Sequence, residues 1–288
     1  MVKIGARIRG MNSADVKASL RYLVPGDAKP IYFASRGGAD AALKIGADFE
    51  DREVTIHDAR QLTTAADLDL QGFTLRAQDT EIENFYALED VQALYDQEMR
   101  DLVLSVTGAS DALVFDHTRR SDSSQVRGQH TSRETASVIH NDYTDASARQ
   151  RVRDLLPDEE AQRRLQHRFA IINVWRSISG PVFNSPLACC DASTIGEADL
   201  VASERRALER IGELQLVCWN PAHRWYYYPQ MTRSEVLLLK TFDSASDGRA
   251  RCSIHTAFSN PLAPPDAPPR ESMESRLLVF FNTGALWP

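Results

Sequence analysis

The second half of the chain is divided into short apolar segments, and this pattern constrains the fold more than any other feature. Turn residues lie between most of the segments, and each segment has the length of an ordinary strand. Many short strands at this spacing are typical of an antiparallel sandwich or barrel. We therefore predict a mainly β protein of the α+β class, with strands at 169–176, 187–190, 214–219, 225–228, 236–242, 252–256 and 276–281.

Helices are predicted at two places. Residues 89–107 carry apolar side chains at helical spacing, and Gly108 supplies a stop signal. Residues 145–168 are rich in Arg, Gln, Glu and Leu, and Pro157 divides this stretch into two short helices. A further strand is predicted at 112–117, directly after the first helix.

The length of 288 residues suits one elaborated domain. Residues 1–40 contain turn signals and are expected to be irregular. We expect a single domain over 1–288, in which 1–110 form an N-terminal extension with helices. The β core would occupy 111–288, with a helical insertion at about 144–168.

Charge and hydropathy exclude several classes of partner. The net charge is −7 and the charged residues are scattered, so no basic stripe points to nucleic acid. No apolar run has the length of a transmembrane helix. Residues 1–10 lack the apolar core of a signal peptide. We expect a cytoplasmic enzyme that acts on a small molecule, without a nucleic-acid or membrane partner, and a homo-oligomer is compatible with these features.

Residues 136–144 are predicted to form a short strand that carries His140 and Asp142. Side chains two positions apart in a strand share a face, so these residues would present an imidazole and a carboxylate side by side. A second histidine would complete the 2-His-1-carboxylate set that holds non-haem Fe(II) and leaves other coordination positions open. His255, in a later predicted strand, is the best candidate. A His-x-Asp pair occurs by chance in many proteins, and the same ligands also suit zinc.

The residues that follow the second histidine extend this pattern. His140, Asp142, His255, Arg270 and Ser272 give the order His-x-Asp, His, Arg-x-Ser. This order resembles the Fe(II)/2-oxoglutarate-dependent oxygenases, whose core is a double-stranded β-helix, or jelly roll. In that superfamily an arginine after the second histidine pairs with the distal carboxylate of 2-oxoglutarate, helped by a hydroxyl group. A planar guanidinium suits this task because it can hold a carboxylate with two hydrogen bonds. The resemblance implies that Arg270 and Ser272 bind the co-substrate.

Further motifs make the resemblance closer and extend it from about Leu20 to Phe281. They lie at 54–60, 114–118, 140–144, 172–176, 220–229, 255–258 and 268–276. Together they resemble the AsaB/CmcJ-type hydroxylase/desaturase family. The resemblance implies His140, Asp142 and His255 as catalytic iron ligands, with Fe(II) as cofactor and 2-oxoglutarate and O2 as co-substrates. It also implies oxidation of a C–H bond of a small secondary metabolite, by hydroxylation, desaturation or ring formation.

Two arginines compete for the distal carboxylate. Arg276 begins the last predicted strand, whereas Arg270 is followed by Ser272 on the same side of the chain. We favour Arg270 for this reason, and a structural salt bridge remains an alternative for either arginine.

Two more residues are candidates for cofactor binding. Asn173 and Trp175 share one face of their predicted strand and Arg176 takes the other, and one of these faces is expected to meet substrate or co-substrate. The tyrosines at 226–228 alternate between faces, so one or two of them are expected to contact the pocket. We include Arg176 and Tyr227 in the candidate set.

Three other functions are compatible with parts of this pattern. A cupin-like iron dioxygenase or isomerase would use the metal without 2-oxoglutarate, but Arg270 and Ser272 would then have no role. A non-catalytic jelly-roll partner subunit would have no use for a complete ligand set. A zinc hydrolase is the third alternative, because two histidines and an aspartate also bind zinc.

Overall fold

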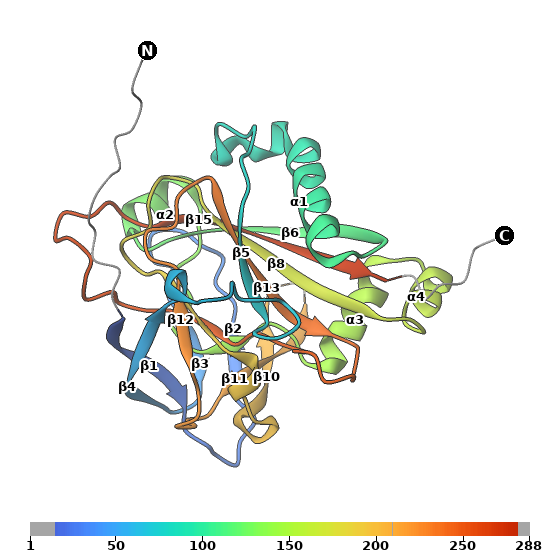
Figure 1. The fold of residues 1–288 in the computed structure, drawn as a ribbon, viewed down its shortest axis with the longest axis horizontal. Helices are drawn as coiled ribbons and strands as arrows, with labels where there is room; N and C mark the ends of the chain where they lie inside the picture. The colour runs from blue at the N-terminus through green and yellow to red at the C-terminus, as the bar shows by residue number, and fades with distance from the viewer. Residues whose placement is uncertain (1–14, 209, 282–288) are drawn as a thin grey trace.

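The structure, a computed structural model, describes residues 15–208 and 210–281, and it is built from two β-sheets with helices on their outer sides (Figure 1). The expectation about a signal peptide concerns residues 1–10, which lie outside the described residues. No helix in the described part combines the length and the apolar character that crossing a membrane requires.

The larger sheet has ten strands, and it contains strands from both ends of the chain. In spatial order these are β1 (Val16–Leu23), β4 (Phe49–Asp58), β12 (Trp225–Tyr227), β9 (Leu187–Cys190), β14 (His255–Ala257), β7 (His140–Asn141), β11 (Ile211–Val217), β10 (Leu200–Arg206), β2 (Ile31–Phe33) and β3 (Lys44–Gly46). The short strands β14 and β7 lie next to each other at its middle.

The smaller sheet has five antiparallel strands. In spatial order these are β5 (Phe73–Ala77), β13 (Glu235–Asp243), β8 (Phe169–Ser177), β15 (Glu271–Phe280) and β6 (Asp111–Ser121). Every residue of β8 is buried, because both faces of this strand are covered. Its outward residues Ile172 and Val174 pack under a helix, whereas Trp175 faces the space between the two sheets, beside Cys189 and Ala257 of the larger sheet.

Four α-helices cover the sheets: α1 (Gln92–Thr107), α2 (Ser124–His130), α3 (Asp145–Leu155) and α4 (Asp158–Arg164). Short 3₁₀ helices occur at Ala59–Gln61, Phe85–Asp90, Ala192–Thr194 and Glu197–Asp199. Helix α1 lies across the outer face of the smaller sheet, with Tyr95 and Met99 buried against it (Figure 1). It ends at Gly108, whose φ of 65° is left-handed and favours glycine.

The mainly β architecture predicted from the sequence is confirmed, as are helix α1 and the two helices separated by Pro157. The expectation that residues 1–40 are irregular is wrong, because β1 alternates buried and exposed residues and pairs along its whole length with β4. The boundary expected at residue 110 marks no break in either sheet, since β4 and β5 each pair with strands of the predicted core.

Candidate metal centre

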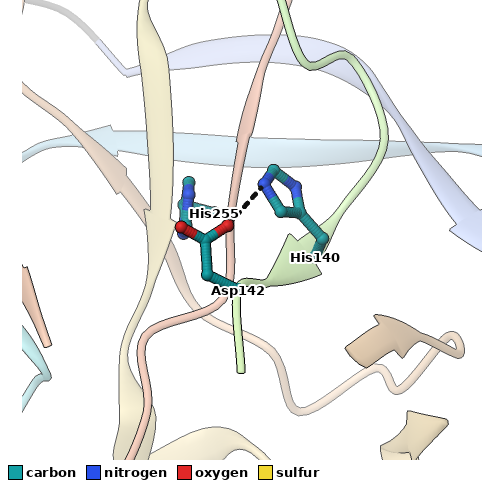
Figure 2. A group of neighbouring side chains, drawn as sticks. All are labelled: His140, Asp142 and His255. Atoms are coloured by element: carbon teal, nitrogen blue, oxygen red, sulfur yellow. Dashed lines mark ion pairs between the residues drawn. The ribbon is translucent and has the colours of Figure 1, made fainter. Parts of the chain in front are cut away.

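His140 and His255 are brought together by strand pairing. The two residues lie directly opposite each other in the antiparallel pair of β7 and β14, so their side chains leave the same face of the sheet. Their ring centroids are 4.5 Å apart. Asp142 follows β7 two positions after His140 and turns its carboxylate toward both rings (Figure 2). One ligand atom from each of the three residues lies within 4.8 Å of the others, as a divalent metal ion requires.

The main chain fixes which nitrogen each imidazole offers. The Nδ1 atom of His140 lies 2.8 Å from the carbonyl oxygen of Val138, and that of His255 lies 3.0 Å from the carbonyl oxygen of Ser253. A carbonyl accepts only, so each Nδ1 carries the hydrogen and each Nε2 keeps its lone pair for a metal. Burial, together with the neighbouring His140, lowers the pKa of His255 to about 4. This ring is therefore neutral, and ready to act as a ligand, at neutral pH.

Asp142 is held in its ionised form. Its Oδ1 lies 3.5 Å from Nε2 of His140, while its Oδ2 accepts hydrogen bonds from Nδ2 of Asn173 at 2.8 Å and Nε of Arg276 at 3.0 Å. Burial by itself raises the pKa of Asp142, but the charge of Arg276 outweighs it and holds the pKa well below the usual range. Two imidazoles and one carboxylate therefore form a donor set that suits Fe(II).

Arg276 is fully occupied by carboxylates. Besides Asp142, it donates through Nη1 to Asp116 at 2.6 Å and through Nη2 to Glu274 at 2.7 Å. Asn173 completes this network, because its Nδ2 also donates to Oε1 of Glu274 at 2.9 Å. The arrangement follows from register: Asn173 and Asp116 sit opposite Arg276 on the two strands that flank β15. The structural salt bridge considered as an alternative for this arginine is what the structure shows.

Arg270 differs from Arg276 in having no acidic partner. It is 2% exposed, and its Nε and Nη2 point to Oγ of Ser272 at 3.2 and 3.1 Å while Nη1 donates to the carbonyl oxygen of Ser185 at 2.7 Å. Its guanidinium lies 5.0 Å from the ring centre of Trp175. Among the residues that the structure describes, no carboxylate forms an ion pair with it. Burial and the nearby Arg120 lower its pKa to about 10, so it remains charged at neutral pH.

The structure separates Arg176 from the metal centre. This side chain points away from Trp175, toward helix α1, where its guanidinium lies 5.6 Å from the ring centre of Tyr95 and 5.9 Å from that of Phe85. Asn173 and Trp175 occupy the inward face of the strand instead. Arg176 therefore packs on the far side of the smaller sheet.

Tyr227 also lies on the face opposite to the ligands. His255 pairs with Cys189, and Cys189 pairs with Tyr226, so Tyr226 shares the face of the metal ligands. Tyr227 points to the other side and packs edge-on against Phe258, with ring centroids 5.5 Å apart. Alternation in the sequence predicted that neighbouring tyrosines would face opposite ways, but only the strand register identifies which one faces inward.

Sequence reasoning missed Asp116 and Glu274. Both carboxylates accept hydrogen bonds from Arg276, which in turn holds Asp142 of the candidate metal centre. Glu274 carried a usable signal. Arg270 directly precedes β15, and Ser272, Glu274 and Arg276 follow within it at intervals of two residues, so these side chains form one polar row. Asp116 lies in the motif at 114–118, but its contact with Arg276 depends on strand pairing, which that motif does not specify.

The metal centre opens into a cavity of about 720 Å³. His140, Asp142 and Arg276 form part of its wall. The cavity lies between the β6 edge of the smaller sheet and strands β10 and β2 of the larger one, with α3 beside it. Its size suits a small-molecule ligand.

Comparison with known proteins identifies the family. A family profile described as "Oxidoreductase/YMDC permease-like domain" matches residues 20–280. The chain is 31% identical over 256 residues to the hydroxylase/desaturase efuI of Hormonema carpetanum, covering 81% of this chain and 85% of that protein. It is 34% identical over 248 residues to the Fe(II)/2-oxoglutarate-dependent dioxygenase nvfI of Aspergillus novofumigatus, covering 79% of this chain and 83% of that protein.

A solved structure extends the similarity to the fold. The iron and alpha-ketoglutarate-dependent endoperoxidase NvfI superimposes with a TM-score of 0.80 at 28% identity, over 93% of this chain and 98% of that one. This match confirms the jelly-roll fold that the motif resemblance implied. The chain therefore belongs to the hydroxylase/desaturase family of Fe(II)/2-oxoglutarate-dependent oxygenases.

Proposed function

We propose that this protein is an Fe(II)/2-oxoglutarate-dependent dioxygenase that oxidises a C–H bond of a small secondary metabolite, by hydroxylation, desaturation or ring formation. The observation that carries the proposal is a buried 2-His-1-carboxylate set in the same barrel as a buried arginine without an acidic partner. Relatives of the family bear the names hydroxylase/desaturase and dioxygenase, which supports this class of reaction.

His140, Asp142 and His255 would hold the metal through two Nε2 atoms and one carboxylate oxygen. Three protein ligands leave room for a bidentate co-substrate and for O2. Fe(II) bound there, together with 2-oxoglutarate and O2, supplies the oxidising power to cleave an unactivated C–H bond, while 2-oxoglutarate becomes succinate and CO2.

The surrounding residues would keep the ligands in place. Asn173 and Arg276 hold Oδ2 of Asp142, so this carboxylate presents a fixed oxygen to the metal. The carbonyl groups of Val138 and Ser253 hold the two imidazoles in one tautomer. Because the ligands are already oriented, little conformational entropy is lost on metal binding.

Arg270 would hold the distal carboxylate of 2-oxoglutarate, with Ser272 as a second donor. A buried cation is costly unless an anion accompanies it, and a carboxylate brought by the co-substrate would remove this cost. Trp175 packs against the same guanidinium, and its buried indole N–H finds no acceptor among the described residues. We assign it as a further donor to the co-substrate. Arg276 is excluded from this role because its three donor nitrogens already serve three carboxylates.

An anaerobic titration tests the proposal. Fe(II) and then 2-oxoglutarate are added to the metal-free protein while the visible spectrum is recorded. We expect a weak charge-transfer band that needs both additions and is absent in Asp142→Ala. In Arg270→Gln the band should form only at 2-oxoglutarate concentrations raised by about tenfold to a hundredfold, since a hydrogen bond to a charged group contributes roughly 1.5–3 kcal/mol.

Two results would count against the proposal. If iron binds without any band, the 2-oxoglutarate assignment fails, and an iron dioxygenase or isomerase that does not use 2-oxoglutarate takes its place. If Fe(II) does not bind at all, the metal assignment fails. A matched variant, Arg176→Gln, changes a buried arginine on the far side of the sheet and should leave the 2-oxoglutarate dependence unchanged.

A further inference from the structure

The cavity beside the metal centre carries an excess of positive charge. Seven arginines and four carboxylates contribute to its lining, although the chain as a whole is acidic. Its lining includes His140 and Asp142 but not Arg270, so it is distinct from the pocket proposed for the distal carboxylate of 2-oxoglutarate.

Part of this charge is neutralised within the protein. Arg276 is paired with three carboxylates, as described above. Arg210 lies 3.3 Å from Asp154. Arg120 donates to the carbonyl oxygen of Glu134 at 2.9 Å and lies 3.8 Å from a carboxylate oxygen of Glu274. These arginines therefore have a structural role.

Of the remaining four arginines, Arg36 is exposed, and the guanidinium of Arg151 lies 5.3 Å from the ring centre of Phe115. Arg133 and Arg205 have no such contact, and neither forms an ion pair or a side-chain hydrogen bond within the described residues. Both are half-buried and line the cavity. Burial lowers the pKa of Arg133, and the charges of Arg120 and Arg205 lower it further. Burial and the charge of Arg276 have the same effect on the pKa of Arg205. Like charges gathered in a partly desolvated cavity destabilise the fold, unless an anion binds between them.

We infer that Arg133 and Arg205 form an anion site for the substrate, and that the substrate carries a carboxylate. Guanidinium groups are suited to carboxylates because they offer planar, paired donors. The inference rests on the proposed function in one respect, which is that this cavity holds the substrate next to the metal. The site fixes one end of the substrate at the cavity wall, so another part of the molecule can reach His140 and Asp142.

Calorimetry with a matched pair of probes tests the site. The probes are 1-naphthoate and 1-naphthamide, which have similar shapes but differ in charge. They are titrated into the enzyme loaded with Fe(II) and saturated with 2-oxoglutarate under anaerobic conditions. We expect naphthoate to bind at least about tenfold more tightly than the amide, since a charged hydrogen bond contributes a factor of this order.

Substitutions then assign the preference to the two arginines. Arg133→Gln and Arg205→Gln should each weaken naphthoate binding about tenfold and leave amide binding unchanged, while the double variant should remove the preference. Arg205→Lys keeps the charge and should keep part of it. Arg206→Gln is the matched control, because Arg206 is exposed, pairs with Glu204 and does not line the cavity. The thermal midpoints of both single glutamine variants should equal or exceed that of the parent, because a repulsive charge has been removed.

Three outcomes would overturn the inference. Equal affinity for the two probes would show that the cavity does not select anions. An equal loss in Arg206→Gln would show that the effect is not local. A loss of 2-oxoglutarate affinity as large as the loss of naphthoate affinity, in Arg133→Gln or Arg205→Gln, would mean that the cavity holds the co-substrate. Failure of the proposed function remains distinguishable, because the metal-free protein should still prefer naphthoate when no iron chelate forms.

Discussion

Replacing Arg276 by methionine should destabilise the fold and should do so in a pH-dependent way. The substitution keeps most of the side-chain volume but leaves Asp142 as a buried carboxylate without its arginine partner, and leaves Glu274 with the more distant Arg120 at 3.8 Å. Asp116 is partly exposed and can be hydrated. Removing one partner of a buried pair costs about 3–5 kcal/mol. We expect one such cost in total, and not one for each carboxylate, because the carboxylates can take up protons and so repel one another less. The thermal midpoint should fall by roughly 6–10 °C, at about 2 °C per kcal/mol for a domain of this size.

The pH dependence follows from the low pKa of Asp142. A carboxyl group whose pKa is depressed by folding stabilises the protein above its unfolded pKa, and this contribution is lost as the pH falls through the folded pKa. Arg276 is a main cause of the depression. Without it the carboxylates take up protons more readily, so the difference between parent and Arg276→Met should be largest near pH 7 and should shrink toward pH 4.

Differential scanning calorimetry in EDTA at pH 7 and at pH 4.5 measures both effects. Arg52→Met is the matched control, since Arg52 forms a surface ion pair with Glu50 and should change stability by no more than about 1 kcal/mol. A shift below about 2 °C for Arg276→Met at pH 7 would refute the reasoning, because the carboxylates would then be adequately solvated without the arginine. A shift that is independent of pH would show that packing, rather than charge, is what the arginine supplies.

Asn173→Asp removes the Nδ2 donor that orients Asp142, so the affinity for Co(II) should fall about tenfold to a hundredfold in a spectroscopic titration. An unchanged affinity would contradict the orienting role. Trp175→Phe removes an unpartnered indole N–H, so the KM for 2-oxoglutarate should rise about fivefold with little change in kcat; a change in kcat alone would not fit. Burial lowers the pKa of His223 despite its hydrogen bond with Asp199. The stability that the neutral ring contributes is present above its unfolded pKa of about 6.5 and is lost as the pH falls below it. His223→Gln should therefore reduce the change of the thermal midpoint with pH between about pH 6.5 and 5. An unaltered pH dependence would exclude this ring as the cause.

Sequence periodicity predicted those parts of the fold that local chemistry specifies. The helix over 89–107 was recognised within three residues of its observed start, because its apolar spacing and its terminal glycine are local signals. Strand β10 (Leu200–Arg206) was missed because its second half is charged. One of those charged residues, Arg205, lines the cavity, so the strand departs from an apolar pattern where it meets the proposed anion site.

The candidate site was predictable only in part. The three proposed metal ligands were selected from the sequence, because the His-x-Asp spacing is local and the family motifs identified the remaining histidine. Strand pairing brings the two histidines together. Arg176 and Tyr227 were selected from strands whose orientation depends on register, and in both cases the inward face belongs to the neighbouring residue. Register arises from long-range pairing, and a single sequence does not reveal it.

The two imidazoles of the metal centre share a feature that bears on how the site can change during evolution. Each Nδ1–H is bonded to the main-chain carbonyl two positions earlier, at Val138 and at Ser253. Main-chain groups are present whatever side chain occupies these positions, so substitutions there leave the histidine tautomers unaltered. Among the described residues, selection could therefore tune the proposed metal site through the carboxylate and its donors Asn173 and Arg276. The orientation of the two histidines is thus inherited with the backbone, while that of the carboxylate is open to mutation.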